Sequence, residues 1–183
     1  MFNRTNEGTE KKCIKEDFLS LYKIYINQNF KICMELSNFL VKAKIETYAS
    51  IGERGEKILQ DGCKELEYTE GNFQYHDKYY GFNPFIGEEV VFDNGDYIWG
   101  MNYYGGVLGY QISAIEVYKF LQKAMRLVRE DRPYRGPSNY TEGNFKYVDK
   151  SEGNFDNFSG IETIFFKGEE VYKLYYHGGV ISK

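Results

Sequence analysis

The hexapeptide YTEGNF occurs twice in this chain, at residues 68–73 and again at residues 140–145. Six identical positions at two places exceed what chance provides in a chain of 183 residues. Self-similarity of this kind indicates a duplicated structural unit and is interpreted before any other pattern. We therefore predict that the fold is built from two related units.

The similarity extends on both sides of the hexapeptide. To its right, the matched pairs are Tyr75 and Tyr147, Asp77 and Asp149, Gly81 and Gly153, Gly87 and Gly160, Gly95 and Gly168, and Tyr103 and Tyr176. To its left, residues 38–44 align with residues 119–125, and both stretches place apolar residues at helical spacing. Each unit is predicted to be a helix followed by strands, with the repeats covering 32–106 and 113–179.

Local signals place the helices and strands within each unit. Ser113 followed three residues later by Glu116 has the pattern of a capping box at a helix N-terminus. Asn94-Gly95 is a strong hairpin signal, while Lys167-Gly168 in the second copy is weaker and favours a bulged turn. Alternation predicts one core-facing set in each copy: Tyr97, Trp99, Met101 and Tyr103, and Glu170, Tyr172, Leu174 and Tyr176.

These patterns predict an α+β fold. Two pseudo-symmetric repeats, each a helix plus antiparallel strands, would form one sheet or a partly open barrel with helices on one face. Residues 1–28 are interpreted as a polar N-terminal tail and an extra helix over 15–27, and 29–183 as a single domain. The 18 tyrosines and 14 phenylalanines suit such a large sheet.

Composition excludes several classes of function. A formal charge of −4 with no run of Lys or Arg argues against direct nucleic-acid binding. No apolar run is long enough to span a membrane, and the first residues lack the apolar region of a signal peptide. Cys13, Cys33 and Cys63 are widely spaced, so we expect reduced thiols, a cytoplasmic protein, no metal site and no cofactor.

Several short stretches resemble one bacterial and archaeal family, the domain of unknown function numbered 5680. They are TYA at 47–49, LEYTEGNF at 66–73, GEEVV at 87–91, WGMNYYG at 99–105, PYRGP at 133–137 and YHGG at 176–179. The resemblance covers roughly residues 34–180 and carries no established activity. Some members look like the C-terminal part of proteins that begin with a helix-turn-helix domain, which implies a sensing or regulatory module.

The PYRGP segment is one candidate ligand-binding element. It places Tyr134 and Arg135 between two prolines, so a rigid loop could present a guanidinium group to an anionic ligand. The alternative is structural, because prolines are common after a helix end and Arg135 could pair with nearby carboxylates.

A second candidate site combines the two copies. Asn102 and Tyr104 lie on the face opposite the predicted core, as do Tyr175 and His177, and a cleft between repeats is a natural ligand site. The alternative is that the tyrosines only cover the sheet and that the histidine lies at the surface. The acids Glu88, Glu89 and Asp93 are interpreted as solvated charges.

The leading hypothesis is a cytoplasmic, non-enzymatic domain that binds a small molecule or a protein partner through Asn102, Tyr104, Tyr134, Arg135, Tyr175 and His177. The first alternative is a small hydrolase that uses His177 with a nearby carboxylate. The second alternative is an interaction or inhibitor protein with an exposed tyrosine-rich face, which would also favour a homodimer.

Overall fold

The computed structural model describes residues 33–50, 55–109 and 111–182. The chain divides into two units, Met1–Leu36 and Ser37–Lys183, and the fold belongs to the second. The predicted tail and extra helix within residues 1–28 lie outside the described residues.

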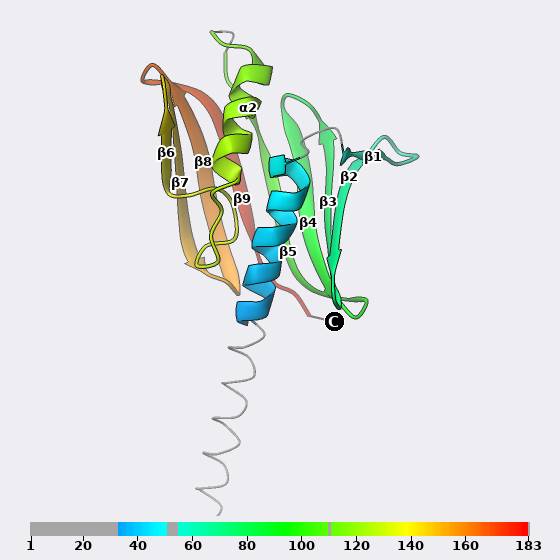
Figure 1. The fold of residues 1–183 in the computed structure, drawn as a ribbon. Helices are drawn as coiled ribbons and strands as arrows, with labels where there is room; N and C mark the ends of the chain where they lie inside the picture. The colour runs from blue at the N-terminus through cyan, green and yellow to red at the C-terminus, as the bar shows by residue number, and fades with distance from the viewer. Residues whose placement is uncertain (1–32, 51–54, 110, 183) are drawn as a thin grey trace, which may run out of the picture. The chain divides into compact units, whose positions relative to one another are not determined.

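The described strands form a single open antiparallel sheet (Figure 1). Its nine strands have the spatial order β1-β2-β3-β4-β5-β9-β8-β7-β6. Their bounds are β1 Lys57–Ile58, β2 Lys64–Glu70, β3 Phe73–Gly81, β4 Phe85–Asp93, β5 Asp96–Val107, β6 Asn139–Glu142, β7 Phe145–Asn154, β8 Asn157–Phe166 and β9 Glu169–Val180. We call β2–β5 the first half and β6–β9 the second half. The two halves join where β5 pairs with β9.

Two helical segments cover one face of this sheet, which we call the inner face (Figure 1). Residues 33–44 are α-helical and continue into the π-helix η1, Ile45–Ala49. The second helix is α2, Ala114–Met125, which contacts both η1 and β7. The prediction of an α+β fold with helices on one face is therefore confirmed, and the sheet is open rather than a barrel.

The predicted signals at element ends match the observed geometry. The Ser113 side chain accepts a hydrogen bond from the Glu116 backbone N–H and donates one to the Glu116 carboxylate, which caps α2. The two YTEGNF copies form the β2–β3 and β6–β7 hairpins, with Gly71 at φ 61° and Gly143 at φ 59°.

The β4–β5 and β8–β9 hairpins both turn through two residues with positive φ. Asn94 and Gly95 have φ of 51° and 86°, and Lys167 and Gly168 have φ of 53° and 91°. Positive φ at both central residues is the requirement of a type I′ turn. The Lys167-Gly168 turn therefore resembles its counterpart, and the bulged turn favoured by the sequence is not needed there.

The core lies between the helices and the inner face of the sheet. The inward residues of the two central strands are buried as predicted: Trp99, Met101 and Tyr103 on β5, and Tyr172, Leu174 and Tyr176 on β9. Tyr97 is 40% exposed and Glu170 is also exposed, so the buried members of the two predicted sets begin at Trp99 and at Tyr172. Both residues lie between the hairpin turn and a shift in strand register. The β4–β5 pairing shifts between Val91 and Phe92, and the β8–β9 pairing shifts between Ile164 and Phe165.

Candidate ligand-binding pocket

Four carboxylates project from the inner face of the sheet and are buried beneath the helices. They are Asp77 on β3, Glu89 on β4, Asp149 on β7 and Glu162 on β8, and we call them the acid cluster. Burying an ionised carboxylate is costly unless cations and hydrogen bonds compensate it. The interpretation of Glu89 as a solvated charge is wrong, because its side chain is only 2% exposed.

Glu162 has the most complete set of partners in the acid cluster. Arg135 binds it in bidentate fashion, with Nη2 at 2.9 Å from Oε1 and Nε at 3.1 Å from Oε2. The hydroxyls of Tyr147 and Tyr172 donate to the same carboxylate at 2.6 and 2.9 Å. Burial lowers the pKa of Arg135, but Glu162, Tyr172 and Tyr147 together raise it further, so this guanidinium stays charged.

Asp149 also has both a cation and a phenol. Arg132 donates to its carboxylate, and the Tyr176 hydroxyl lies 3.0 Å from Oδ1. The pKa of Asp149 is nevertheless raised to about 7, because burial and the nearby Glu162 outweigh Arg132. The PYRGP loop and the residues before it thus supply the cations of the second half.

The first half compensates its two carboxylates differently. Lys44 forms a buried ion pair with Glu89, and Arg135 Nη1 approaches Glu89 Oε1 at 4.0 Å. Burial lowers the pKa of Lys44. Asp77 accepts a hydrogen bond from the Tyr103 hydroxyl, and its pKa is raised to about 7 by burial and by Glu89.

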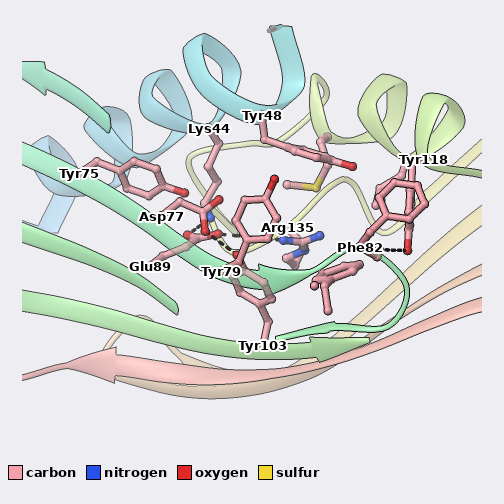
Figure 2. Close-up of a pocket in the computed structure, with 14 residues that line it drawn as sticks. Lys44, Tyr48, Tyr75, Asp77, Tyr79, Phe82, Glu89, Tyr103, Tyr118 and Arg135 are labelled. Carbon is pink, nitrogen blue, oxygen red and sulfur yellow. Dashed lines mark hydrogen bonds and ion pairs between the residues drawn. The ribbon is translucent and has the colours of Figure 1, made fainter. Parts of the chain in front are cut away.

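A small cavity of about 50 Å³ opens beside this part of the acid cluster (Figure 2). Its charged lining consists of Lys44, Asp77, Glu89 and Arg135, and its aromatic lining includes Tyr48, Tyr75, Tyr79, Phe82, Phe85 and Tyr118. At one end lie Gly81, which is exposed, and Phe82, which is 44% exposed. The arrangement is a polar floor with aromatic walls, a lining that small-molecule sites share, but its volume fits a group of a few atoms and not a drug-sized ligand.

Helix α2 supports the exposed end of this cavity. The Tyr118 hydroxyl donates to the carbonyl of Phe82 at 2.9 Å, and the two rings pack edge to face at 5.4 Å between centroids. The β3–β4 connection, which carries Phe82, is therefore tied to the helical layer. This contact keeps one aromatic wall of the cavity in place.

The structure divides the six sequence-predicted site residues between the two faces of the sheet. Asn102 pairs with His177 across β5 and β9, and Tyr104 pairs with Tyr175, so these four lie together on the outer face. Arg135 and Tyr134 lie on the inner side, where Arg135 binds Glu162 and Tyr134 stacks on Phe158 at 3.9 Å. Arg135 is only 6% exposed, so this guanidinium is directed to the interior rather than presented to solvent.

The outer face carries a row of exposed apolar residues next to these four. Cross-strand pairing joins Tyr80, Ile86, Tyr104, Tyr175 and Ile161 in that order from β3 to β8. Their exposed fractions range from 42% to 55%. We call this row the outer ladder.

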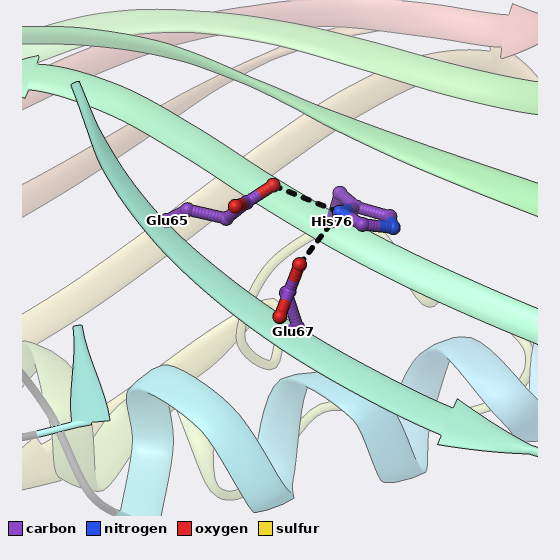
Figure 3. A group of neighbouring side chains, drawn as sticks. All are labelled: Glu65, Glu67 and His76. Atoms are coloured by element: carbon purple, nitrogen blue, oxygen red, sulfur yellow. Dashed lines mark hydrogen bonds and ion pairs between the residues drawn. The ribbon is translucent and has the colours of Figure 1, made fainter. Parts of the chain in front are cut away.

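The two histidines have different surroundings. Among the described residues, no hydrogen bond or ion pair joins His177 to a carboxylate, so the geometry expected of a histidine-based hydrolase is not found there. His76 Nδ1 lies 2.9 Å from Glu65 Oε1 and 3.5 Å from Glu67 Oε1 (Figure 3). Lys78 Nζ lies 3.4 Å from Glu65 Oε1, so we interpret this group as an ion-pair network rather than a metal site.

The fold and site thus define an α+β domain with a buried acid cluster and a small aromatic pocket. Residues 77–181 match the family described as Domain of unknown function (DUF5680), and the chain belongs to that family. This confirms the resemblance found in the sequence. Comparison with curated proteins and with solved structures gives no match. Within the described residues, no helix has the length and apolar character needed to span a membrane.

The acid cluster is the feature that sequence reasoning missed. One usable signal was present, since Asp77 and Asp149 are matched and lie two residues beyond the matched, buried Tyr75 and Tyr147. Positions two apart on a strand share a face, so an inward-facing Tyr75 or Tyr147 requires the acid two residues later to face the core as well.

Proposed function

We propose that this chain is a non-enzymatic domain that binds a small molecule in the pocket beneath its helices, in a sensory or regulatory role in the cytoplasm. One observation carries the proposal: Asp77, a buried carboxyl in the pocket wall, has no ion-pair partner within 4 Å among the described residues. An ionised carboxylate that is buried without a cation is costly. A ligand that contacts Asp77 would offset that cost.

The lining of the pocket favours binding over catalysis. Its described residues include no serine, threonine, cysteine or histidine that could act as a nucleophile or as a neutral base. Lys44 and Arg135 already pair with carboxylates, which holds both cations in place. The aromatic walls supply contact area for a ligand.

A thermal-shift screen of nucleotides, sugars, amines and other metabolites tests the proposal. We expect at least one compound to raise the melting temperature of the wild-type protein. Tyr79→Ala, which opens the pocket wall, should remove the shift, and Tyr104→Ala on the outer face should retain it. If no compound acts, or if the shift depends on Tyr104 instead of Tyr79, the inner pocket is not the binding site.

We also infer that the two halves descend from one duplicated unit and are related by an approximate two-fold axis. In its support, the matched tyrosines Tyr103 and Tyr176 face each other in the β5–β9 register. Matched acids also occupy equivalent strands, Asp77 on β3 and Asp149 on β7. A duplication accounts for the two hydrogen bonds in which Tyr103 and Tyr176 donate to these acids.

A second candidate function is pairing with another copy of this chain through the outer ladder. Ile86 and Ile161 flank the Tyr104–Tyr175 pair, and the same exposed row of a second copy would cover it in a two-fold, isologous interface. Light scattering after size-exclusion chromatography should then show a dimer that Tyr175→Asp dissociates. A monomer at all concentrations would exclude this use of the outer ladder.

A further inference from the structure

The equivalent aspartates of the two halves, Asp77 and Asp149, have different partners, and this difference indicates the class of ligand. Asp149 contacts the Arg132 guanidinium and the Tyr176 hydroxyl. Asp77 contacts the Tyr103 hydroxyl, but no ammonium or guanidinium lies within 4 Å of it in the described part of the chain. Within the residues that the structure describes, the first half therefore has no counterpart of the Arg132 cation that pairs with Asp149.

The charges that face Asp77 do not supply this cation. Glu89 on β4 repels the ionised form of Asp77, while Lys44 from the helix and Arg135 from the loop after α2 attract it. Both cations are already committed, since Lys44 pairs with Glu89 and Arg135 pairs with Glu162. With Arg132 paired to Asp149, Asp77 is the member of the acid cluster without an ion-pair partner among the described residues.

The walls around this position suit a positive charge. The Tyr75 ring lies 5.8 Å from Lys44 Nζ and the Tyr103 ring lies 5.9 Å from the Arg135 guanidinium carbon, so the interior already uses cation–π contacts. Aromatic rings around a carboxylate are a known means of recognising ammonium groups. Tyr79, Phe82 and Tyr118 add further rings toward the exposed end.

We propose, on the basis of the small-molecule function above, that the ligand is a small organic cation whose ammonium group sits against Asp77. The ammonium would take the place that Arg132 takes at Asp149. A cavity of about 50 Å³ admits the charged head and an adjacent carbon or two, and the rest of the ligand extends past Phe82. A primary amine or a methylated ammonium attached to an apolar body fits this description.

The same geometry disfavours other ligand classes. An anion would approach two carboxylates while the two cations of the pocket are already paired, so it would meet net repulsion. A neutral ligand would leave the ionised form of Asp77, which prevails above pH 7, without a counterion. The site therefore discriminates by charge as well as by shape.

Binding of a cation should depend on pH in a defined direction. The pKa of Asp77 is about 7, so the carboxyl is mostly protonated at pH 6 and mostly ionised at pH 8. An amine that stays protonated over this range should bind about tenfold more tightly at pH 8 than at pH 6, since it needs the ionised form. The predicted dependence is opposite to that of an anionic ligand.

Isothermal titration calorimetry with four probes tests this assignment: benzylamine, benzyltrimethylammonium, the neutral benzyl alcohol, and benzoate. We expect at least one of the two cations to bind, while benzyl alcohol and benzoate do not. Asp77→Asn should weaken cation binding at least tenfold. Glu88→Gln is the matched control, because Glu88 is an exposed acid next to Glu89 and does not line the pocket, and it should bind as the wild type does.

Several outcomes would overturn the assignment. Equal binding of benzylamine and benzyl alcohol would remove the charge preference, and full binding by Asp77→Asn would remove the role of the carboxylate. If Asp77→Asn fails to fold, the wild-type pH series decides, and equal affinity at pH 6 and pH 8 contradicts the proposal.

The calorimetry and the thermal-shift screen together distinguish a failure of the cation assignment from a failure of the proposed function. A neutral or anionic compound that binds in a Tyr79-dependent way would preserve the pocket as a ligand site but overturn the cation assignment. If neither the probes nor any compound of the metabolite screen binds, both proposals are overturned.

Discussion

At the scale of single residues, Asp77 should make the stability of the ligand-free protein depend on pH. Its pKa is about 7 in the folded chain and about 3.8 as an ordinary aspartate, because burial disfavours its charge. Folded Asp77 therefore holds a proton between these values that the unfolded chain releases. Its contribution to stability is fully present below about pH 4 and is lost as the pH rises through 7.

Asp77→Asn should flatten this dependence. We expect the wild type to lose about 2 kcal/mol more of its free energy of unfolding between pH 5 and pH 8 than the variant loses. Asp149, whose pKa is also about 7, contributes to the pH dependence of stability in both the wild type and the variant. Urea unfolding at the two pH values measures the difference, and identical slopes in both proteins would contradict the assignment.

Lys44 should stabilise the fold mainly by compensating Glu89. Lys44→Met leaves that carboxylate buried with only Arg135 Nη1 at 4.0 Å, which should cost about 3 kcal/mol. Methionine is a suitable replacement because Met125 occupies the aligned position of the other helix. The double variant Lys44→Met/Glu89→Gln should recover part of the loss. Urea unfolding measures both variants, and a double variant no more stable than Lys44→Met would contradict the role assigned to Lys44.

At the scale of elements, two glycines with different surroundings provide a matched test of packing. A Cβ added to Gly87 on β4 would meet the Tyr103 hydroxyl and would lie 2.6 Å from the Lys78 carbonyl oxygen. A Cβ added to Gly100 on β5 has its nearest neighbour at 3.4 Å. The first substitution forces a strand and a buried ring to move, while the second has room.

Gly87→Ala should therefore lower the free energy of unfolding by about 2 kcal/mol, the usual cost of overpacking. Gly100→Ala should change it by less than about 1 kcal/mol. Chemical unfolding monitored by circular dichroism measures both variants. Equal losses would mean that the Tyr103 ring does not constrain β4 in the way that the structure indicates.

The elements themselves were largely predictable, because each depends on local chemistry. Ser113 and Glu116 mark the start of α2, and Asn94-Gly95 marks a hairpin whose backbone needs positive φ. The acid cluster was not predictable in the same way. Acids are seldom buried, and the cations that make burial tolerable here, such as Lys44 for Glu89, come from segments distant in the sequence. Asn102 lies on the face opposite the core, as the alternation indicated, whereas the pairing of Arg135 with Glu162 joins residues 27 positions apart and could not be assigned from local sequence.

At the scale of the whole molecule, Trp99 reports on the junction of the halves. It is the only tryptophan in the chain, and it stacks on Phe158 of β8 at 5.6 Å between centroids. Because β5 also pairs with β9 along its length, we expect both halves to unfold together. Tryptophan fluorescence and far-ultraviolet circular dichroism should give coincident transitions in urea.

Phe158→Ala tests this junction directly. The ring is buried between Trp99 and Tyr134, so its removal should lower the free energy of unfolding by about 3 kcal/mol through the cavity that remains. The fluorescence of Trp99 should change in the folded state as well. A small loss of stability with unchanged fluorescence would show that the halves are held together mainly by strand pairing.

The ends of the sheet carry a consequence for how the protein behaves at high concentration. The outermost strands are β1, with two residues, and β6, with four. They cover only part of their neighbours, because β1 pairs with two residues of β2 and β6 with four residues of β7, so an added strand would meet a stepped border and not one continuous row of backbone groups. Lateral growth into fibrils is thereby discouraged, even though most strands of the described sheet are long and several are rich in tyrosine.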